Sequence, residues 1–160
     1  MIQAMPFPIT IPFVEHLEFE FVGYGGGEAE IAILLRDELT NTWGVAHGGV
    51  TMTLLDIVMA HAARSPDQSG FDASRGVVTI EMKTSFMRPA TGRLVGRGKV
   101  LHRTGATAFC EGSVFDAQGA LLAHATGTFK FLKALPVDGK LVQRVKIGRA
   151  SCRERVYSSV

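Results

Sequence analysis

The sequence lacks the features that mark several classes of protein. Only two of its 160 residues are cysteine, Cys110 and Cys152, so no disulfide framework is expected and a reducing compartment, the cytoplasm, is predicted. No uninterrupted run of about 18 apolar residues is present, so we expect no membrane partner. The segment up to Phe13 contains no Lys or Arg and is not expected to be a signal peptide.

An excess of positive charge is also missing from most of the chain. Seventeen Lys and Arg stand against fifteen Asp and Glu, and three of these Arg and one of these Glu lie in residues 147–160. The rest of the chain is therefore neutral. A nucleic-acid-binding protein usually carries a basic patch on its folded domain, so nucleic acid is not the expected partner.

The C-terminal segment has an unusual origin in our interpretation. Residues 147–156 match, in order, one reading frame of a common sequencing-adapter oligonucleotide, ATC GGA AGA GCG TCG TGT AGG GAA AGA GTG. A basic C-terminal arm is the alternative. The length fits one domain, which we place at residues 1–136, followed at 137–160 by a tail that is expected to be disordered and partly artefactual.

Hydrophobic patterning predicts an α+β protein. Residues 48–64 are apolar almost all the way round a helix, which is typical of a buried helix. Alternating runs joined by short glycine-containing connections predict antiparallel strands. These runs cover residues 17–22, 28–35, 77–88, 93–103, 107–116 and 120–132. An antiparallel β-sheet wrapped around one long central helix accounts for this order.

One acidic residue interrupts the apolar helix. Asp56 lies between Leu55 and Ile57, and no Lys or Arg is within one helical turn to pair with it. Burying an unpaired carboxylate costs several kcal/mol or more. Asp56 is therefore either bonded to the backbone or hydroxyl groups of a neighbouring strand, or it is a general base or nucleophile.

The start of the same helix offers backbone donors. His47, Gly48 and Gly49 precede it, and the first amides of a helix have no internal acceptor. The Gly48 amide could hold an acyl oxygen as an oxyanion donor, with Gly49 contacting substrate. Gly48 and Asp56 are eight residues apart, about 12 Å along the axis. They can serve one reaction only if two copies pack with their helices antiparallel, which predicts a homodimer at least.

The segment from Asn41 through His47-Gly48-Gly49 to Asp56 resembles the signature of PaaI-type hotdog-fold acyl-CoA thioesterases, in the 4-hydroxybenzoyl-CoA thioesterase superfamily. The resemblance continues through residues 78–90 and 123–129 and covers about residues 12–135. It implies a hotdog fold and a homodimer or homotetramer. It also implies an acyl-CoA substrate, of which coenzyme A is a part.

The resemblance also implies catalytic roles. Asp56 matches the acidic residue that attacks the thioester or activates water, and the Gly48 amide matches the group that polarises its carbonyl. Asn41 matches an asparagine near the leaving sulfur or the water. His47 matches a histidine that shapes the turn, and Thr79 matches a hydroxyl that helps to place the water.

Candidate substrate contacts lie on the helix and at a hairpin end. Met52, Leu55 and Met59 are predicted to line an acyl pocket that suits an aryl or medium-length group. Arg103 and Thr104, at an exposed hairpin end, are predicted to hold the coenzyme A phosphates, unless they are simply solvated. No metal-ligand spacing was found and no cofactor is expected, because a thioester is already activated.

The predicted function is hydrolysis of an acyl-CoA thioester to the free acid and coenzyme A. Two alternatives remain open. A non-catalytic acyl-CoA-binding protein could bind its ligand at the same site and would not need Asp56. A hotdog hydroxyacyl-thioester dehydratase would need a catalytic His paired with an acid, and that pattern is not found in the sequence.

Overall fold

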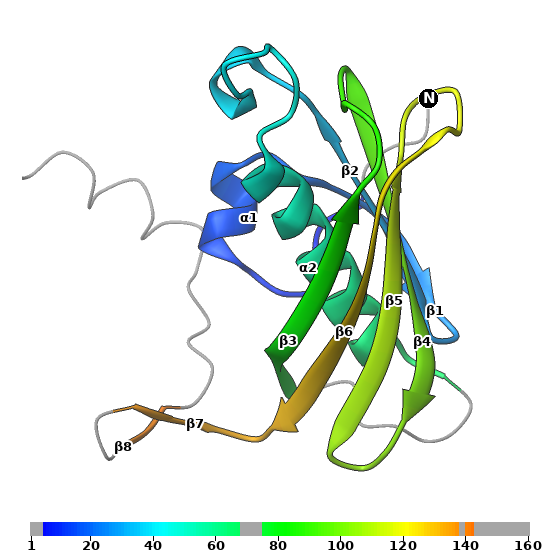
Figure 1. The fold of residues 1–160 in the computed structure, drawn as a ribbon. Helices are drawn as coiled ribbons and strands as arrows, with labels where there is room; N and C mark the ends of the chain where they lie inside the picture. The colour runs from blue at the N-terminus through cyan, green and yellow to red at the C-terminus, as the bar shows by residue number, and fades with distance from the viewer. Residues whose placement is uncertain (1–4, 68–74, 138–139, 143–160) are drawn as a thin grey trace, which may run out of the picture.

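One long helix lies against a curved sheet of six antiparallel strands (Figure 1). The computed structural model describes residues 5–67, 75–137 and 140–142. The helices are α1 (Pro12–His16) and α2 (Gly48–Arg64), with a 3₁₀ turn at Asp37–Leu39. The strands are β1 (Glu20–Gly25), β2 (Glu28–Leu34), β3 (Gly76–Phe86), β4 (Arg93–Arg103), β5 (Thr107–Phe115) and β6 (Leu121–Leu132).

The architecture predicted from the sequence is confirmed, with two local corrections. Helix α2 occupies residues 48–64 as expected, but β1 begins later than predicted, because Glu18 has φ of 58° and turns the chain after α1. Two short paired strands, β7 (Leu135–Val137) and β8 (Lys140–Val142), lie where a disordered tail was expected to begin. Most of the expected tail, residues 143–160, lies outside the described chain.

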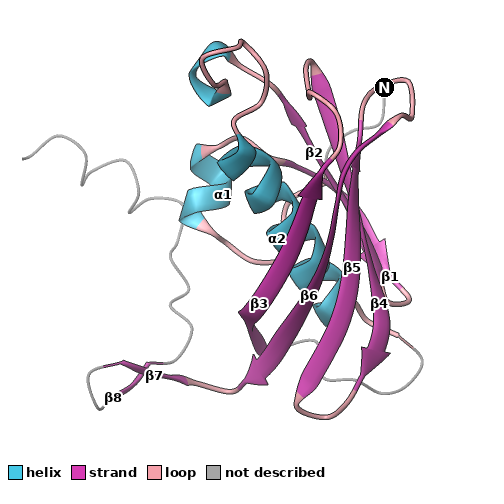
Figure 2. Cartoon of the chain, in the orientation of Figure 1, coloured by secondary structure: helices cyan, strands magenta, loops and turns pink. Residues whose placement is uncertain are grey.

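The sheet order is β1-β2-β4-β5-β6-β3, and α2 packs on its inner face (Figure 2). The helix side chains that face the sheet are completely buried: Leu54, Leu55, Val58, Met59, Ala62 and Ala63. Glycines on the strands allow this close approach. A Cβ atom at Gly98 would lie 2.5 Å from the carbonyl oxygen of Val58, so only glycine fits there.

The two edges of the sheet differ. Outside β1, Met5 forms an isolated antiparallel bridge with Phe21. β3 is the last strand on the other side, and within the described ranges no strand pairs with its outer edge. Alternate residues along β3 therefore present unpaired backbone groups at this edge, and such an edge is a template for pairing with another chain.

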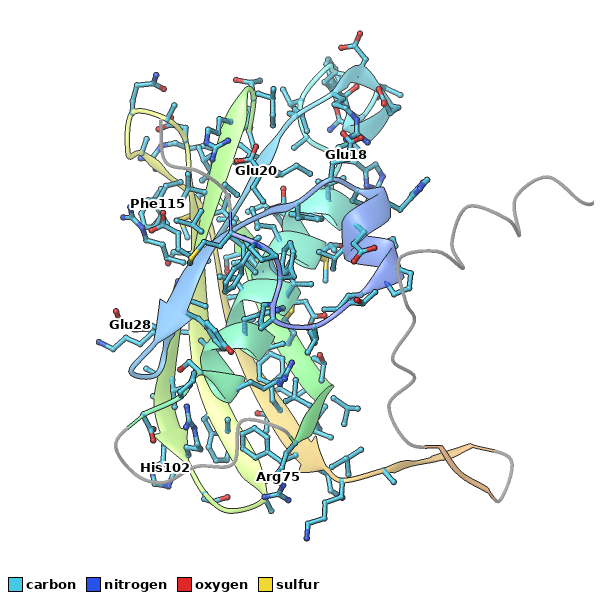
Figure 3. The ribbon with its side chains drawn as sticks, turned by 180° about the vertical axis from the view of Figure 1, so that it is seen from behind. Glu18, Glu20, Glu28, Arg75, His102 and Phe115 are labelled. Carbon is cyan, nitrogen blue, oxygen red and sulfur yellow. The ribbon has the colours of Figure 1, made fainter. Side chains whose placement is uncertain are left out.

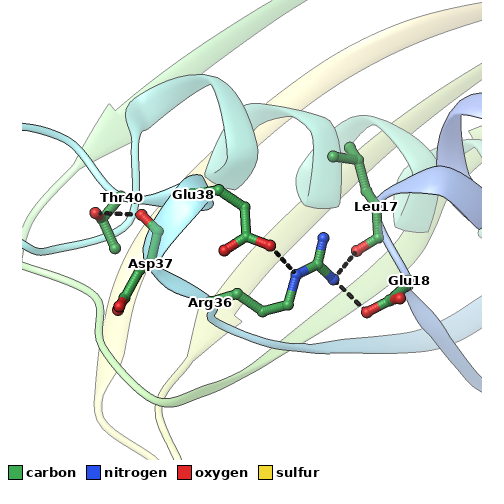
Figure 4. A network of polar contacts seen from close by, with 6 residues as sticks. All are labelled: Leu17, Glu18, Arg36, Asp37, Glu38 and Thr40. Atoms are coloured by element: carbon green, nitrogen blue, oxygen red, sulfur yellow. Dashed lines mark hydrogen bonds and ion pairs between the residues drawn. The ribbon is translucent and has the colours of Figure 1, made fainter.

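The loop that leads into α2 is fastened by one arginine (Figure 4). Arg36 forms ion pairs with Glu18 and, at 3.0 Å, with Glu38, and it donates to the carbonyl oxygen of Leu17. A backbone hydrogen bond and the Arg36 guanidinium lower the pKa of Glu38. Because these groups join the end of β2 to the turn after α1, the chain enters the loop at residues 40–47 from a fixed position.

Candidate active site

The N-terminus of α2 keeps one backbone donor unused. His47 is the N-cap residue, and its Nδ1 atom accepts a hydrogen bond from the Gly49 amide at 3.0 Å. The amides of Val50 and Thr51 donate to the carbonyl oxygen of His47. The Gly48 amide has no acceptor in the part of the chain that the structure describes. Since His47 holds its neighbours, the Gly48 amide is left as a donor for a ligand oxygen.

This amide borders a groove of about 370 Å³ between the loop before α2 and the end of β3. Asn41, Phe86 and Met87 also line it. Asn41 closes the loop, since its Oδ1 atom accepts from the Trp43 amide at 2.9 Å, and this leaves the side-chain nitrogen as a donor. The groove therefore combines polar donors with apolar walls, as small-molecule sites commonly do.

Asp56 is held by the edge strand of the sheet. Its Oδ1 atom accepts a hydrogen bond of 2.6 Å from the Thr79 hydroxyl on β3. This is the bond to a neighbouring strand that the first interpretation of Asp56 predicts, and a general base or nucleophile can be held by the same bond. The carboxylate is only half-buried, however, and its Oδ2 atom accepts no hydrogen bond from the described residues. One oxygen is fixed in place while the other is left for a reacting group.

The predicted catalytic residues therefore form two half-sites rather than one. Gly48, Met52 and Asp56 are spaced four residues apart and share one face of α2. The Gly48 half-site includes Asn41 and the cap formed by His47, whereas the Asp56 half-site includes Thr79. The structure does not bring the two together within one chain, because about 12 Å of helix separates them.

Two of the predicted acyl-pocket residues lie elsewhere. Leu55 and Met59 are 0% exposed and pack against the inner face of the sheet, where Met59 contacts Gly112 and Gly127. Because both side chains are completely buried against the sheet, whereas Asp56 is half-buried, we assign them to the core. Met52 is 40% exposed and lies on the same face as the two half-sites.

The predicted coenzyme A contacts are corrected as well. Arg103 was expected to be exposed, but its side chain is only 10% exposed and pairs with Asp67 at 2.9 Å. It also donates, at 3.4 Å, to the carbonyl oxygens of Ala62 and Ser65, and so closes the C-terminal end of α2. Thr104 accepts hydrogen bonds from the amides of Ala106 and Thr107 within its own turn. Arg103 therefore has structural partners at the C-terminal end of α2, and Thr104 has structural partners within its own turn.

Phe86 is one of the groove residues that sequence reasoning missed. It is 55% exposed, and its ring carbon Cζ would lie 3.6 Å from a Cβ atom at Gly48. Alternation along β3 could have shown that Phe86 shares the inward face with Met82 and Thr84. Nothing in the sequence placed the end of that strand beside the start of α2.

A larger hollow of about 500 Å³ lies on the outer face of the sheet, lined by Glu30, Arg97 and Phe115 among others. There Arg97 pairs with Glu30 at 2.9 Å and lies over the Phe115 ring. Figure 3 shows Glu28, another residue of this hollow, pointing away from the molecule. The hollow contains none of the predicted catalytic residues. Its larger volume therefore does not make it a better candidate active site than the groove beside Gly48.

Other reactive groups give no competing site. Cys110 is 1% exposed, and burial raises the pKa of its thiol to about 12, so this thiol is not a candidate nucleophile. Among the described residues, no three His, Cys, Asp or Glu side chains are grouped so that they could hold a metal ion. In the same ranges no helix has the length and apolar character needed to cross a membrane.

Comparison with known proteins places this geometry in a family. Residues 44–123 match the family model described as the thioesterase superfamily. A Saccharolobus solfataricus protein named "Putative esterase" is 30% identical over 118 residues, which are 73% of this chain and 81% of that protein. The chain therefore belongs to the thioesterase superfamily.

Solved structures agree on the fold. A conserved protein from Pseudomonas aeruginosa superposes with a TM-score of 0.72 at 28% identity, over 79% of this chain and all of that one. The E. coli PaaI protein from the phenylacetic acid degradation operon gives a TM-score of 0.69 at 18% identity, over 77% and 86% of the two chains. The predicted hotdog fold and the resemblance to PaaI-type proteins are confirmed.

Proposed function

We propose that this thioesterase-superfamily protein hydrolyses an acyl-CoA thioester to a carboxylic acid and coenzyme A. The observation that carries the proposal is the pair of half-sites on one face of α2. An unused Gly48 amide lies at one end, and an Asp56 carboxylate held by Thr79 lies at the other. Acyl transfer needs both an oxyanion donor and a nucleophile or base.

The proposed site forms between two copies of the chain. If two α2 helices pack antiparallel, Gly48 of one copy faces Asp56 of the other, and two equivalent sites result. The thioester carbonyl oxygen accepts from the Gly48 amide, and negative charge that develops on this oxygen is stabilised there. A homodimer is the smallest assembly that completes the site, and a homotetramer would contain the same pair.

Asp56 has two possible roles, and both remain open. As a nucleophile, one carboxylate oxygen attacks the thioester carbon, the C–S bond breaks, and the thiolate leaves; water then hydrolyses the mixed anhydride. As a general base, Asp56 takes a proton from water while the hydroxide attacks the same carbon; the C–S bond then breaks, and the departing thiolate takes up the proton from Asp56. Thr79 donates to one oxygen and so positions the other for either step. Asn41 is proposed to orient the water or the departing sulfur.

The groove walls indicate the acyl group. Phe86 and Met87 are exposed apolar side chains beside Gly48, and Met52 lies on the same helix face. These residues suit an aryl or medium-length acyl chain better than a charged one. The proposed reaction needs no cofactor, since the thioester is itself reactive, and a cytoplasmic location remains a prediction from the cysteine content.

Thiol release from a panel of aryl- and alkyl-CoA esters tests the proposal. The wild type should turn over at least one ester. Asp56→Asn should reduce kcat about 10³-fold while the assembly and the Tm persist, because Asn keeps the shape and removes the base or nucleophile. Full turnover by Asp56→Asn would exclude its catalytic role.

Binding provides the matched control. Asp56→Asn should still bind the ester that the wild type hydrolyses, which can be followed by calorimetry. If the wild type binds acyl-CoA esters tightly and hydrolyses none, the protein is a non-catalytic acyl-CoA-binding member of the superfamily. If it instead forms an enoyl product from a hydroxyacyl ester, the dehydratase alternative replaces the hydrolase.

A further inference from the structure

We infer that Trp43 stacks on the adenine ring of the substrate's coenzyme A and so favours a thioester that carries the nucleotide over one that lacks it. The inference rests on the proposed function for one premise, that the ligand is an acyl-CoA ester. It goes further because it names a residue that recognises the end of the ligand away from the thioester.

Trp43 is the most exposed large apolar side chain among the residues that the structure describes. It is 86% exposed, whereas the other exposed side chains of this kind are 40–58% exposed. Trp has a large apolar ring system and is highly buried on average. A side chain that lies almost wholly in solvent contributes little to the packing of the single chain, so its energetic value must come from a contact with another molecule.

The backbone around Trp43 is held by hydrogen bonds on both sides of the side chain. The Asn41 amide donates to the carbonyl oxygen of Val45 at 2.8 Å, and the Gly44 amide donates to that of Asn41 at 3.0 Å. The Trp43 amide donates to the Oδ1 atom of Asn41 at 2.9 Å. Gly44 completes the turn with φ of 73°, a conformation that favours glycine. The loop is therefore preorganised, and little conformational entropy is lost when the indole contacts a ligand.

The same turn connects Trp43 to the groove beside Gly48. Asn41, which accepts from the Trp43 amide, lines this groove. Figure 1 shows the loop, in cyan, at the N-terminal end of α2. Trp43 and Gly48 are five residues apart, so no more than about 18 Å separates their Cα atoms. The extended pantetheine arm, which joins the thioester to the diphosphate and adenine, has a comparable length. A ligand bound by the Gly48 amide can therefore bring its adenine to Trp43.

The exposure of Trp43 favours the nucleotide over the acyl group as the part that it contacts. Phe86 and Met87 already form apolar walls in the groove, where an acyl group is shielded from water. The charged nucleotide remains in solvent, and its adenine is the only flat ring in coenzyme A. An open indole offers this ring a face to stack on. Such stacking strengthens the binding of a base roughly tenfold.

The residues that the sequence predicted to hold coenzyme A do not fill this role. Arg103 pairs with Asp67 and with carbonyl oxygens at the C-terminal end of α2, and Thr104 bonds within its own turn. Trp43 instead lies on the loop that leads into the N-terminal end of α2, where the Gly48 amide is. The nucleotide of a ligand bound there lies closer in the chain to Trp43 than to either of them.

Fluorescence tests the contact without any turnover, because Trp43 is the only tryptophan in the sequence. In the free protein acrylamide should quench the emission strongly. Coenzyme A, and ADP at higher concentration, should lower the emission and protect the indole from acrylamide, whereas pantetheine, which lacks the nucleotide, should do neither. Free tryptophan in the same solutions corrects for absorption by the nucleotide. An indole that is already shielded in the free protein, or that coenzyme A leaves unprotected, would overturn the inference.

Substitutions measure how much the ring contributes. Trp43→Ala should raise the Kd for coenzyme A about tenfold in calorimetry, and Trp43→Phe, which keeps a stacking face, should recover most of the affinity. Phe109→Ala is the matched control, since it removes another exposed aromatic ring, on β5, that does not line the groove. An equal loss of affinity in Phe109→Ala and Trp43→Ala would overturn the inference.

A pair of substrates separates recognition of the nucleotide from a general disturbance of the loop. The ratio of kcat/KM for an acyl-CoA ester to kcat/KM for the matching acyl-pantetheine ester should fall about tenfold in Trp43→Ala, mainly through KM for the acyl-CoA ester. A disturbed loop would slow both esters alike and leave the ratio unchanged, which would overturn the inference.

These outcomes are separable from those that test the hydrolase. Protection of Trp43 by coenzyme A, with a tenfold loss of affinity in Trp43→Ala but no thioester turnover by the wild type, would support the contact and overturn the hydrolase. Turnover of acyl-CoA esters with an unchanged ratio in Trp43→Ala would overturn the contact and leave the hydrolase standing.

Discussion

The two faces of helix α2 are built for different purposes. The face against the sheet is completely buried: Leu54 packs against Gly96 and Val58 against Gly98. The other face has half-exposed side chains, an unused amide at Gly48 and a carboxylate at Asp56. The fold therefore depends on one side of this helix and the proposed chemistry on the other, so substitutions on the two sides should have separable effects.

The largest effect is expected where the packed face meets the sheet. In Gly98→Ala the new Cβ atom would lie 2.5 Å from the Val58 carbonyl oxygen and 3.0 Å from the Met59 amide nitrogen. Both are backbone atoms, so helix and strand must separate. We expect the free energy of unfolding to fall by about 3 kcal/mol or more, as measured by urea denaturation.

Gly105→Ala is the matched control for that change. A Cβ atom at Gly105 would meet nothing within 4 Å, so its unfolding free energy should stay within about 0.5 kcal/mol of the wild type. Equal effects of the two glycine substitutions would show that close helix–sheet contact does not set the stability of the packed face.

A smaller effect, on catalysis rather than stability, is expected on the open face. Thr79→Val keeps the shape of the side chain but removes the hydrogen bond to Asp56. Bonds to charged groups contribute about 1.5–3 kcal/mol, so kcat should fall roughly 10- to 100-fold with little change in KM. Steady-state kinetics measure kcat and KM separately. Thr79→Ser keeps the hydroxyl and should recover most of the wild-type kcat. A Thr79→Ser variant as slow as Thr79→Val would show that the hydroxyl does not support catalysis.

The packed face was also the part that the sequence predicted best. The apolar run at residues 48–64 and the alternating runs that follow it are local signals, and they gave α2 and most strand bounds correctly. Asp56 could be singled out because a carboxylate stands out among apolar neighbours. Its bond to Thr79 is of the kind predicted by the alternative in which Asp56 is bonded to a neighbouring strand, whereas the resemblance implied that Thr79 places the water.

The errors came from properties that depend on tertiary packing. A helix that is apolar almost all round gives no sign of which residues face the sheet, so Leu55 and Met59 were placed in the pocket although they are in the core. Arg103 is at a hairpin end in the sequence, but the end of α2 and Asp67 come to it in space and occupy its guanidinium. Phe86 was overlooked because its neighbour Gly48 is 38 residues away along the chain.

The smallest expected effect has the opposite sign and lies within the open face. Thr53 is half-buried, and its hydroxyl donates to the Gly49 carbonyl oxygen at 2.8 Å, a bond back to the preceding turn that does not strengthen a helix. Thr53→Ala should raise the unfolding free energy by about 0.5 kcal/mol, since alanine has the higher helix propensity. Leu54→Ala, one position along on the packed face, should lower it by about 2–5 kcal/mol. Denaturation of both variants measures the contrast directly, and a loss of stability in Thr53→Ala comparable to that of Leu54→Ala would mean that both faces of α2 are equally committed to the fold.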